Sequence, residues 1–301
     1  MPELPEVETI LRGLKSQVVG RCIRDVQIGD PKVLQLKVSD LRDRTHRQTI
    51  RGLSRRGKFL IFELDLHYLI FHLGMTGQLT FRDPSRKDSR RFTKHPVTGL
   101  QRAVQHAPDR HTHLQIQLDE GTALFYRDIR KFGKIFLIEK RQQNPLAVFF
   151  ERLGLEPFTA DYNVEAFLKG LRYPKRSVKS LLLDQGFVAG IGNIYADEAL
   201  FEACIHPARR VRSLRRAEKI QLFEAIPRVL EQGIRHGGTS MRDYVNSDGE
   251  RGSNQEELRV YGRQGEACCR CQTVIQKTIV SQRGTHFCPS CQPRRPRKLS
   301  S

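Results

Sequence analysis

The chain is short of acidic residues: 33 aspartates and glutamates stand against 52 lysines and arginines, so the formal net charge is +19. An excess of this size predicts a polyanionic partner, either nucleic acid or an anionic membrane surface. The chain lacks a run near the ~20 apolar residues of a membrane-spanning helix, and it has no lipidation signal. The start also lacks the basic and apolar regions of a secretory signal. We therefore expect a cytoplasmic protein whose partner is nucleic acid and not a membrane.

The cysteine pattern argues against a disulfide framework. The seven cysteines are an odd number, and five of them fall between residues 268 and 291. Such clustering is typical of metal binding in a reducing compartment. Cys268 and Cys271 form one Cys-x-x-Cys pair, and after sixteen residues Cys288 and Cys291 form another. Four thiolates complete the tetrahedral shell of Zn²⁺ at about 2.3 Å each, which predicts one structural zinc ion. Buried free thiols or a redox pair are the alternative.

The remaining cysteines have no such pattern. Cys269 falls inside the first pair, and we expect it to take no part in the metal shell. Cys22 and Cys204 stand alone and are predicted core residues. The residues between the two pairs can form a hairpin, and its turn is expected near Arg283 and Gly284.

The first half of the chain has the alternation of β-strands. Between about residues 21 and 140, apolar and polar residues alternate in short runs rich in β-branched and aromatic residues, which predicts an antiparallel sandwich. The runs are 59–64, 68–75, 113–119, 122–129 and 134–139. The basic stretch 82–110 has no period and is expected to be a mobile loop.

The second half has helical signals. After a predicted linker at 151–163, helical patterns cover 164–171, 178–185 and 194–205. A longer helix should follow Ser213 as its N-cap, and Pro227 should kink or end it. From about residue 258 short strands return. The whole chain is thus expected to be an α+β protein.

The opening stretch, MPELPEVETI, predicts a helix. Val7, Ile10, Leu11 and Leu14 share one helical face, and Pro5 is tolerated in a first turn. The three glutamates at positions 3, 6 and 8 suit the positive end of the helix dipole, and for Glu8 this structural explanation is sufficient.

Pro2 has a further potential. The residue is small enough for Met1 to be removed, which would expose a secondary amine that titrates near ~7.7–8. The helix dipole should lower that pKa further. Such an amine can attack a sugar carbon and give a cationic iminium, which acts as an electron sink for elimination of phosphate. A nearby carboxyl group can protonate the opening sugar ring.

The segment VAGIGNIYADEAL (188–200) contains a second candidate. Gly190 and Gly192 precede a predicted helix, where backbone N–H groups can approach a phosphate, and Asn193 is a further donor. The alternative is a turn in which the glycines only permit close packing.

Several motifs, in order from residue 1 to about 291, together resemble formamidopyrimidine-DNA glycosylase, a bacterial enzyme that excises oxidised purines. These motifs are MPELPEVET, HLGMTG (72–77), DIRKFG (128–133), GIGNIYADEALF, GGTSMRDY (237–244), VYGRQGEACCRC and SQRGTHFCPSC. The resemblance implies an N-terminal helix plus β-sandwich, then a helix–two-turn–helix domain with a C-terminal zinc ribbon, and DNA in the cleft between them. The boundaries implied are 1–152 for the catalytic domain, 158–250 for the helical domain, 258–292 for the Cys₄ ribbon and 293–301 for a basic tail.

The resemblance also implies catalytic roles in base-excision repair. Pro2 is the Schiff-base nucleophile at C1′, Glu3 the proton donor to the sugar, and Glu6 a supporting carboxylate. Lys58 lies at a phosphate and serves β-elimination, and Arg283 grips phosphates and assists δ-elimination. On sequence alone, both residues could equally be solvated turn or strand-end residues.

Further residues are implied to hold the DNA. Met75, Arg130 and Phe132 fill the gap that an extruded base leaves, and the arginine bonds the orphaned base. The other implied DNA contacts are His111, Lys175 and Asn193. Without the resemblance, Met75 and Phe132 are expected core residues.

Two departures from the family pattern stand out: the long basic insertion 82–110, and SNQEEL (253–258) in place of an aromatic-containing lesion loop. An endonuclease VIII-type relative that prefers oxidised pyrimidines is one alternative, and the opening motif together with Met75, Arg130 and Phe132 argues against it. A non-catalytic zinc-ribbon DNA-binding protein is the other, and it leaves the opening stretch unexplained. From the resemblance we expect a monomer, associated with the nucleoid, that binds double-stranded DNA with oxidised bases or abasic sites.

Overall fold

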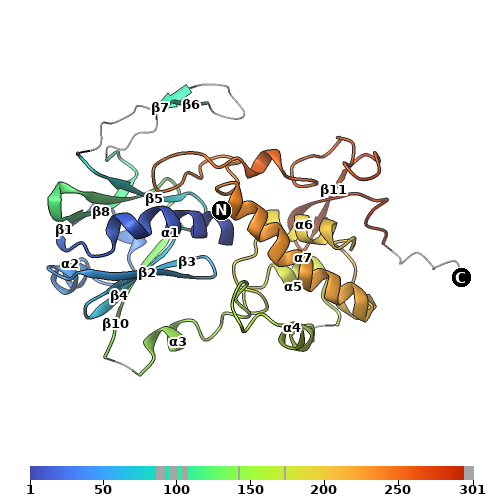
Figure 1. Ribbon diagram of the computed structural model, residues 1–301, viewed down its shortest axis with the longest axis horizontal. Coiled ribbons are helices and arrows are strands. Elements are labelled where there is room, and N and C mark those ends of the chain that lie inside the picture. The colour runs from blue at the N-terminus through green and yellow to red at the C-terminus, as the bar shows by residue number, and fades with distance from the viewer. Residues whose placement is uncertain (86–91, 95–100, 104–107, 142, 173, 295–301) are drawn as a thin grey trace, which may run out of the picture. The chain divides into compact units, whose positions relative to one another are not determined.

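The computed structural model describes residues 1–85, 92–94, 101–103, 108–141, 143–172 and 174–294 (Figure 1). It divides into two compact units. The first unit comprises Met1–Glu151 and Gly233–Gln255, and the second comprises Arg152–Gln232 and the residues from Glu256 onward.

The first unit is a sandwich of two four-stranded antiparallel sheets. One sheet has the order β1-β8-β9-β5 and the other β10-β4-β3-β2. The strands of the first sheet are β1 (Ile23–Ile28), β5 (Gly77–Arg82), β8 (Thr112–Leu118) and β9 (Ala123–Asp128). Those of the second are β2 (Ile50–Arg56), β3 (Phe59–Leu64), β4 (His67–His72) and β10 (Lys134–Glu139). The five strands predicted from alternation are confirmed, whereas β1, β2 and β5 had no clear signal.

Helix α1 (Leu4–Val18) completes this core. It contacts β2, β3 and β5, and Val7, Ile10 and Leu14 are fully buried among the residues of both sheets. These side chains recur every three or four positions, so they lie on one face of the helix, and this face is buried against apolar side chains along its length. The predicted amphipathic opening helix is therefore confirmed. Two shorter helices, α2 (Val38–Thr45) and α3 (Pro145–Phe149), also belong to this unit.

The basic insertion contains secondary structure that its sequence did not predict. Strands β6 (Phe92–Lys94) and β7 (Gln101–Ala103) pair antiparallel, with Phe92 opposite Ala103. The expectation of a loop without elements is therefore wrong for these two stretches. Residues 86–91, 95–100 and 104–107 of the insertion lie outside the described residues.

The second unit is mainly helical. It contains α4 (Val164–Gly170), α5 (Val178–Leu182), α6 (Asn193–Glu202) and most of α7 (Arg216–Arg235), followed by the hairpin of β11 (Gln276–Val280) and β12 (Arg283–Phe287). The predicted helices are confirmed, and the predicted N-cap of the longest helix is wrong. Ser213 ends a short 3-10 turn, and its hydroxyl donates to the Arg210 carbonyl, so it does not cap α7. Pro227 was expected to kink or end this helix, and it does not end it, since α7 continues to Arg235.

None of the helices among the described residues has both the length and the apolar character that crossing a membrane requires. Residues 295–301 of the predicted basic tail lie outside the described residues.

Candidate functional site

The N-terminal segment is held by the carboxylate of Glu6. Its Oε2 accepts a hydrogen bond from the Glu3 N–H at 2.7 Å, and its Oε1 accepts one from the Thr239 N–H at 2.8 Å. Glu3 is the N-cap of α1, and both glutamates are buried, with exposed fractions of 3% and 1%. A carboxylate bonded to two backbone N–H groups is strongly anchored. Glu6 therefore fixes the residues beside Pro2 to the GGTSMRDY segment.

This segment can approach α1 only because Gly238 has no side chain. Gly238 has φ +86°, and a Cβ at that position would lie 3.0 Å from Cγ of Glu6 and 2.8 Å from the Tyr244 ring. The Tyr244 hydroxyl donates to the Gly237 carbonyl at 3.1 Å. Burial, with a smaller contribution from the Glu6 charge, raises the pKa of Tyr244, so this hydroxyl stays a donor at all ordinary pH values. Two of the motifs singled out in the sequence thus form one structure.

Pro2 precedes this anchored turn. It is buried, whereas Met1 is 49% exposed. While Met1 is attached, the Pro2 nitrogen is an amide and cannot act as a nucleophile. Removal of the exposed Met1 would place a secondary amine at the start of α1, one residue from the Glu3 carboxyl group.

The hairpin that carries Lys58 is joined to the same helix. Arg55, near the end of β2, donates through Nε to Glu8 on α1 at 3.0 Å and through a terminal nitrogen to the Gly57 carbonyl at 3.1 Å. Burial of Glu8 opposes its ionisation, but the hydrogen bonds from Arg55 and Arg12 outweigh that effect and lower its pKa. Glu8 is therefore a structural ion-pair partner, as its position in the helix suggested.

Lys58 follows in this hairpin and is buried, with 6% of its surface exposed. It is not the solvated strand-end lysine of the alternative interpretation. Burial and, to a smaller degree, the Lys58 charge lower the pKa of His72 to about 4, so this ring is neutral at neutral pH. The ring contacts Phe59, with 4.7 Å between the ring centroids.

Three exposed side chains from two loops meet at one end of the sandwich. Met75, from the β4–β5 loop, and Phe132, from the β9–β10 loop, are 41% and 51% exposed. The guanidinium of Arg130 lies 4.5 Å from the Phe132 ring centroid and 3.2 Å from the Met75 sulfur. Large apolar side chains are normally buried, and their exposure in a group indicates a binding surface. We call Met75, Arg130 and Phe132 the wedge cluster; the expectation from sequence alone that Met75 and Phe132 are core residues is wrong.

A buried carboxylate organises the backbone of these loops. Asp128 is fully buried, and one of its oxygens accepts the hydroxyl of Thr76 and the N–H of Arg130 at 3.2 Å. Its other oxygen accepts the Gly133 N–H at 2.8 Å and the Tyr126 hydroxyl at 3.2 Å. Asp128 thus binds both loops of the wedge cluster, a role that sequence reasoning missed. The DIRKFG motif includes it, but its partners near residue 76 are remote in sequence.

His111 is attached to the same aspartate. Its carbonyl accepts the Asp128 N–H at 2.9 Å, and its own N–H donates to Asp109 at 2.9 Å. The structure therefore brings four of the predicted DNA-contact residues, the wedge cluster and His111, around one buried group.

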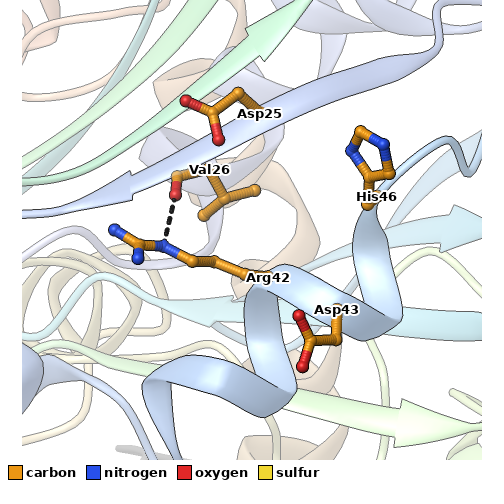
Figure 2. Close-up of a pocket in the computed structure, with 5 residues that line it drawn as sticks. All are labelled: Asp25, Val26, Arg42, Asp43 and His46. Carbon is orange, nitrogen blue, oxygen red and sulfur yellow. Dashed lines mark hydrogen bonds between the residues drawn. The ribbon is translucent and has the colours of Figure 1, made fainter.

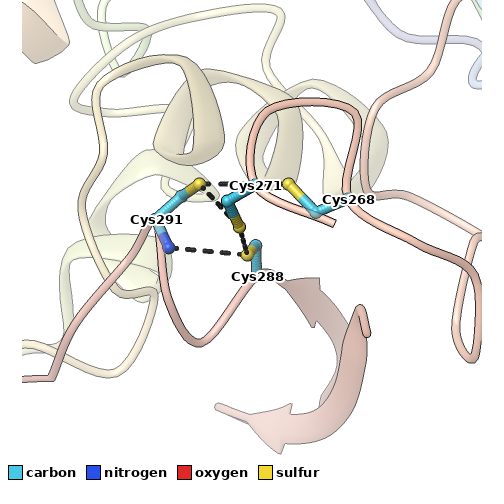
Figure 3. Close-up of side chains that lie close together, drawn as sticks. All are labelled: Cys268, Cys271, Cys288 and Cys291. Atoms are coloured by element: carbon cyan, nitrogen blue, oxygen red, sulfur yellow. Dashed lines mark hydrogen bonds between the residues drawn. The ribbon is translucent and has the colours of Figure 1, made fainter. Parts of the chain in front are cut away.

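The four cysteines of the two Cys-x-x-Cys pairs converge in the second unit (Figure 3). Their sulfurs lie within 4.8 Å of one another, with separations of 3.4 Å for Cys271–Cys288 and 3.9 Å for Cys268–Cys291. A tetrahedron with metal–sulfur bonds of about 2.3 Å has edges of about 3.8 Å. The donor set and its spacing therefore fit one zinc ion.

Local hydrogen bonds support this assignment. The N–H groups of Arg270 and Cys291 each donate to a cysteine sulfur at 3.4 Å. Hydrogen bonds from Thr273 lower the pKa of Cys271 to about 6, whereas burial raises the pKa of Cys288 and of Cys291; a bound cation would favour the thiolate form of all four cysteines. With four protein ligands no open position remains, so the ion is structural. Cys269 is exposed and outside this group, as expected. Cys204 is also exposed and Cys22 only half-buried, so neither is the core residue predicted.

The zinc ribbon hairpin presents Arg283 at its turn. The two turn residues are Ser281 and Gln282, both with positive φ, and Arg283 is the exposed first residue of β12. The turn was predicted near Arg283 and Gly284, and it lies directly before Arg283.

The residue after Arg283 is clamped by the helices of the second unit. The Gly284 carbonyl accepts hydrogen bonds from the Asn193 side chain at 2.9 Å and from Lys179 Nζ at 3.1 Å. Lys179 is completely buried and forms an ion pair with the equally buried Asp197 at 2.6 Å. A buried ammonium group is tolerated only when it is paired with an opposite charge. The paired Lys179 also holds the Gly284 carbonyl, directly after Arg283. This ion pair was not predicted, because Lys179 and Asp197 lie in separate helical segments and no local pattern shows that they meet.

Lys175 is exposed just before α5. The Gly190 N–H, predicted to approach a phosphate, donates instead to the Gln185 side chain at 3.0 Å.

A pocket of about 370 Å³ lies elsewhere in the first unit, between β1 and α2 (Figure 2). It is lined by Asp25, Val26, Arg42, Asp43 and His46, and Arg42 donates to the Val26 carbonyl at 2.9 Å. It contains none of the residues considered above.

Three family models match the chain. They describe the formamidopyrimidine-DNA glycosylase N-terminal domain at residues 1–135, the H2TH domain of the same enzyme at 153–245, and a zinc finger found in FPG and IleRS at 265–294.

Curated relatives match over the full length. The formamidopyrimidine-DNA glycosylase of Enterococcus faecalis is 41% identical over 300 residues, which cover 99% of this chain and 100% of the relative. That of Shouchella clausii is 40% identical over 296 residues, with 98% and 100% covered.

Solved structures agree. A Lactococcus lactis FPG variant in complex with a Fapy-dG containing DNA has a TM-score of 0.84 and 37% identity, with 97% of this chain and 100% of that chain covered. The same enzyme with an abasic-site DNA also has a TM-score of 0.84 and 37% identity, with 97% and 99% covered. The α+β fold, the H2TH helices and the zinc ribbon are thereby confirmed. The chain belongs to the formamidopyrimidine-DNA glycosylase family.

Proposed function

We propose that the chain excises oxidised purines, 8-oxoguanine and formamidopyrimidines, from double-stranded DNA and then cleaves the backbone at the resulting abasic site by β,δ-elimination. This is the bifunctional glycosylase and lyase activity of base-excision repair. The observation that carries the proposal is the anchored first turn of α1, where Glu6 holds the backbone beside Pro2 and Glu3.

The first step uses the Pro2 nitrogen, free once Met1 is removed. Its lone pair forms a bond to C1′ while the glycosidic bond breaks and the base leaves with that electron pair and a proton. The sugar ring then opens between C1′ and its ring oxygen, and the nitrogen becomes an iminium. Glu3, one residue away, donates a proton to that oxygen as a general acid.

The iminium drives the later steps. It withdraws electrons from C2′, which loses a proton, and the 3′ phosphate leaves as the β-elimination product. Loss of a second proton then expels the 5′ phosphate. The buried Lys58 serves the β-elimination, and the exposed Arg283 stabilises the departing phosphate charge. Water finally hydrolyses the Schiff base and restores the amine.

Excision from a duplex also requires extrusion of the base, which costs a few kcal/mol of unstacking. The wedge cluster supplies two apolar side chains and one arginine, which fill the vacated space and bond the orphaned base. His111, Lys175 and Asn193 contact the phosphates. The zinc ion holds the ribbon together and takes no part in the chemistry. We expect a monomer.

A second substrate class has one observation in its favour. A solved complex of the Lactococcus lactis enzyme contains an oxidised pyrimidine DNA, with a TM-score of 0.82 and 37% identity. Side-by-side cleavage of paired 8-oxoguanine and thymine-glycol duplexes tests the preference. We expect faster excision of the purine, and faster excision of the pyrimidine would place the chain's activity with endonuclease VIII.

Borohydride reduction during reaction with abasic-site DNA tests the covalent mechanism. The protein should become attached to the DNA, because reduction converts the iminium into a stable amine. A matched protein with an uncleaved N-terminal extension should not be trapped, since its Pro2 nitrogen is an amide. Equal trapping of both proteins would refute the mechanism, and no trapping of either would favour a non-catalytic DNA-binding protein.

A further inference from the structure

An arginine-rich segment of the second unit runs beside the start of α5. Hydrogen bonds join the Val211 N–H to the Arg176 carbonyl at 3.0 Å and the Arg212 N–H to the Pro174 carbonyl at 3.2 Å. Ser177 and Arg210 form an antiparallel bridge. Residues 209–212 and 174–178 are therefore neighbouring backbone segments, joined by these hydrogen bonds and by an isolated bridge.

The arginines of this segment differ in their surroundings. Arg209 is buried and bonds Glu218 with two nitrogens, at 2.5 and 3.1 Å, so its charge is compensated. Arg210 and Arg212 are exposed. Among the described residues, no carboxylate lies within ion-pair distance of Arg210 or Arg212, or of Lys175 in the neighbouring segment. Acidic residues nearby are already paired, since Glu218 binds Arg209 and Asp184 binds Arg176.

Like charges close together on neighbouring segments repel each other in the free protein when no carboxylate compensates them. An anion placed over them removes the repulsion and releases its own condensed counterions, so such a surface favours a polyanion.

The same surface adjoins the ribbon turn. The Ser177 hydroxyl lies 3.4 Å from the Ser281 hydroxyl, two residues before Arg283. The Asn193 side chain bonds Gly284, on the other side of Arg283. Arg210, the bridge partner of Ser177, thus lies close to the candidate phosphate-binding residues of this unit.

We propose that Arg210 and Arg212 form an additional contact with the DNA backbone, which extends the phosphate surface of Lys175, Asn193 and Arg283 along the duplex. The inference rests on the proposed function for the location of the DNA. It does not depend on catalysis, because the contact is made to phosphates away from the reacting sugar.

The test is DNA binding at several salt concentrations. Fluorescence anisotropy would measure the Kd of a duplex that contains a tetrahydrofuran abasic analogue, which cannot form a Schiff base. The logarithm of the association constant falls linearly with the logarithm of the salt concentration, and each lost phosphate contact reduces the magnitude of this slope by about 0.9. Arg210→Gln and Arg212→Gln should each lower it by about 0.9, and the double variant by about 1.8.

Controls separate a local contact from net charge and from misfolding. Arg228→Gln removes one exposed charge from α7, where Arg228 pairs with Glu224, and should leave the slope unchanged. The double lysine variant, Arg210→Lys with Arg212→Lys, should retain the wild-type slope, because a point charge is sufficient for a phosphate contact. Thermal unfolding should be unchanged in all variants, since these side chains are exposed.

A wild-type slope in the double glutamine variant would overturn the proposal, and so would an equal loss in Arg228→Gln. If trapping by borohydride fails while the slope still falls as expected, the proposed catalysis is wrong and the DNA contact remains.

Discussion

Replacement of Asp128 should remove the hydrogen bonds that hold the two loops of the wedge cluster in place. The carboxylate accepts four hydrogen bonds and is fully buried. In Asp128→Ala the Gly133 N–H and the hydroxyls of Thr76 and Tyr126 lose this partner, whereas the Arg130 N–H keeps the Thr76 hydroxyl oxygen at 3.1 Å. A buried donor without a partner costs about 1–3 kcal/mol, so we expect a loss of about 2–5 kcal/mol in the stability of the first unit.

Asp128→Asn is a finer change. The asparagine keeps one oxygen, but its NH2 group replaces the other oxygen and would face the Gly133 N–H. Both groups are donors, so no hydrogen bond can form between them. We expect a loss of about 1–3 kcal/mol, or a fall in Tm of about 2–4 °C per kcal/mol. Asp25→Asn, an exposed change on β1, should stay within about 0.5 kcal/mol.

The functional consequence should depend on base pairing. A displaced wedge cluster cannot fill the gap in a duplex, and a loss of about 1.4 kcal/mol in the transition state lowers kcat/KM tenfold. For a lesion in an unpaired bubble the base is already unstacked, so the same variant should lose much less activity. Single-turnover rates on the two substrates measure this ratio. An unchanged Tm, or an equal loss on both substrates, would refute the assigned role of Asp128.

Three further predictions follow from the other contacts. Cys288→Ser, or removal of zinc by a chelator, should unfold the ribbon and weaken DNA binding, because metal binding and folding are linked there. The zinc content and the DNA affinity, by anisotropy, are measured on the same sample. A metal-free protein with full DNA affinity would contradict this prediction. Lys179→Met should destabilise the second unit by about 3–5 kcal/mol, since Asp197 is left buried without its cation. In denaturant unfolding, the double variant Lys179→Met with Asp197→Leu should lose less stability than Lys179→Met alone. An unchanged stability of Lys179→Met would refute the pairing. The pKa of Glu8 is lowered in the folded state, so its ion pairs stabilise the protein above the unfolded pKa of ~4.3, and this contribution disappears as the pH falls through the folded pKa. Glu8→Gln should therefore lower the stability by about 1 kcal/mol at pH ~7 and by almost nothing under strong acid. A loss of stability that does not depend on pH would contradict the assignment.

The elements that the sequence predicted are those whose signal is local. The buried face of α1 follows from four apolar residues at helical spacing, and β3, β8 and β9 follow from their alternation. Strand β2, IRGLSRR, was missed because glycine, serine and arginines occupy most of it and only Ile50 and Leu53 are buried. Its place in the sheet comes from pairing with β3, which no local pattern encodes.

The candidate site divides in the same way. Four cysteines at fixed spacing predicted their own convergence, because the ligand geometry of zinc constrains the chain. The partners of the groups that support the site were not predictable, since these partners are distant in sequence. Asp128 bonds Thr76, Lys179 bonds Gly284, and Glu6 bonds Thr239. The turn of the ribbon lies directly before the predicted position because Ser281 and Gln282 adopt a left-handed backbone that glycine usually supplies.

The central claim is that the free nitrogen of Pro2 forms the bond to DNA. The direct measurement is mass spectrometry of the borohydride-trapped complex after proteolysis, which locates the sugar remnant on a single residue. The account predicts that it lies on the N-terminal peptide, at Pro2, in a chain without Met1. A remnant on a lysine such as Lys58, or an active protein whose terminus is retained or blocked, would contradict the account.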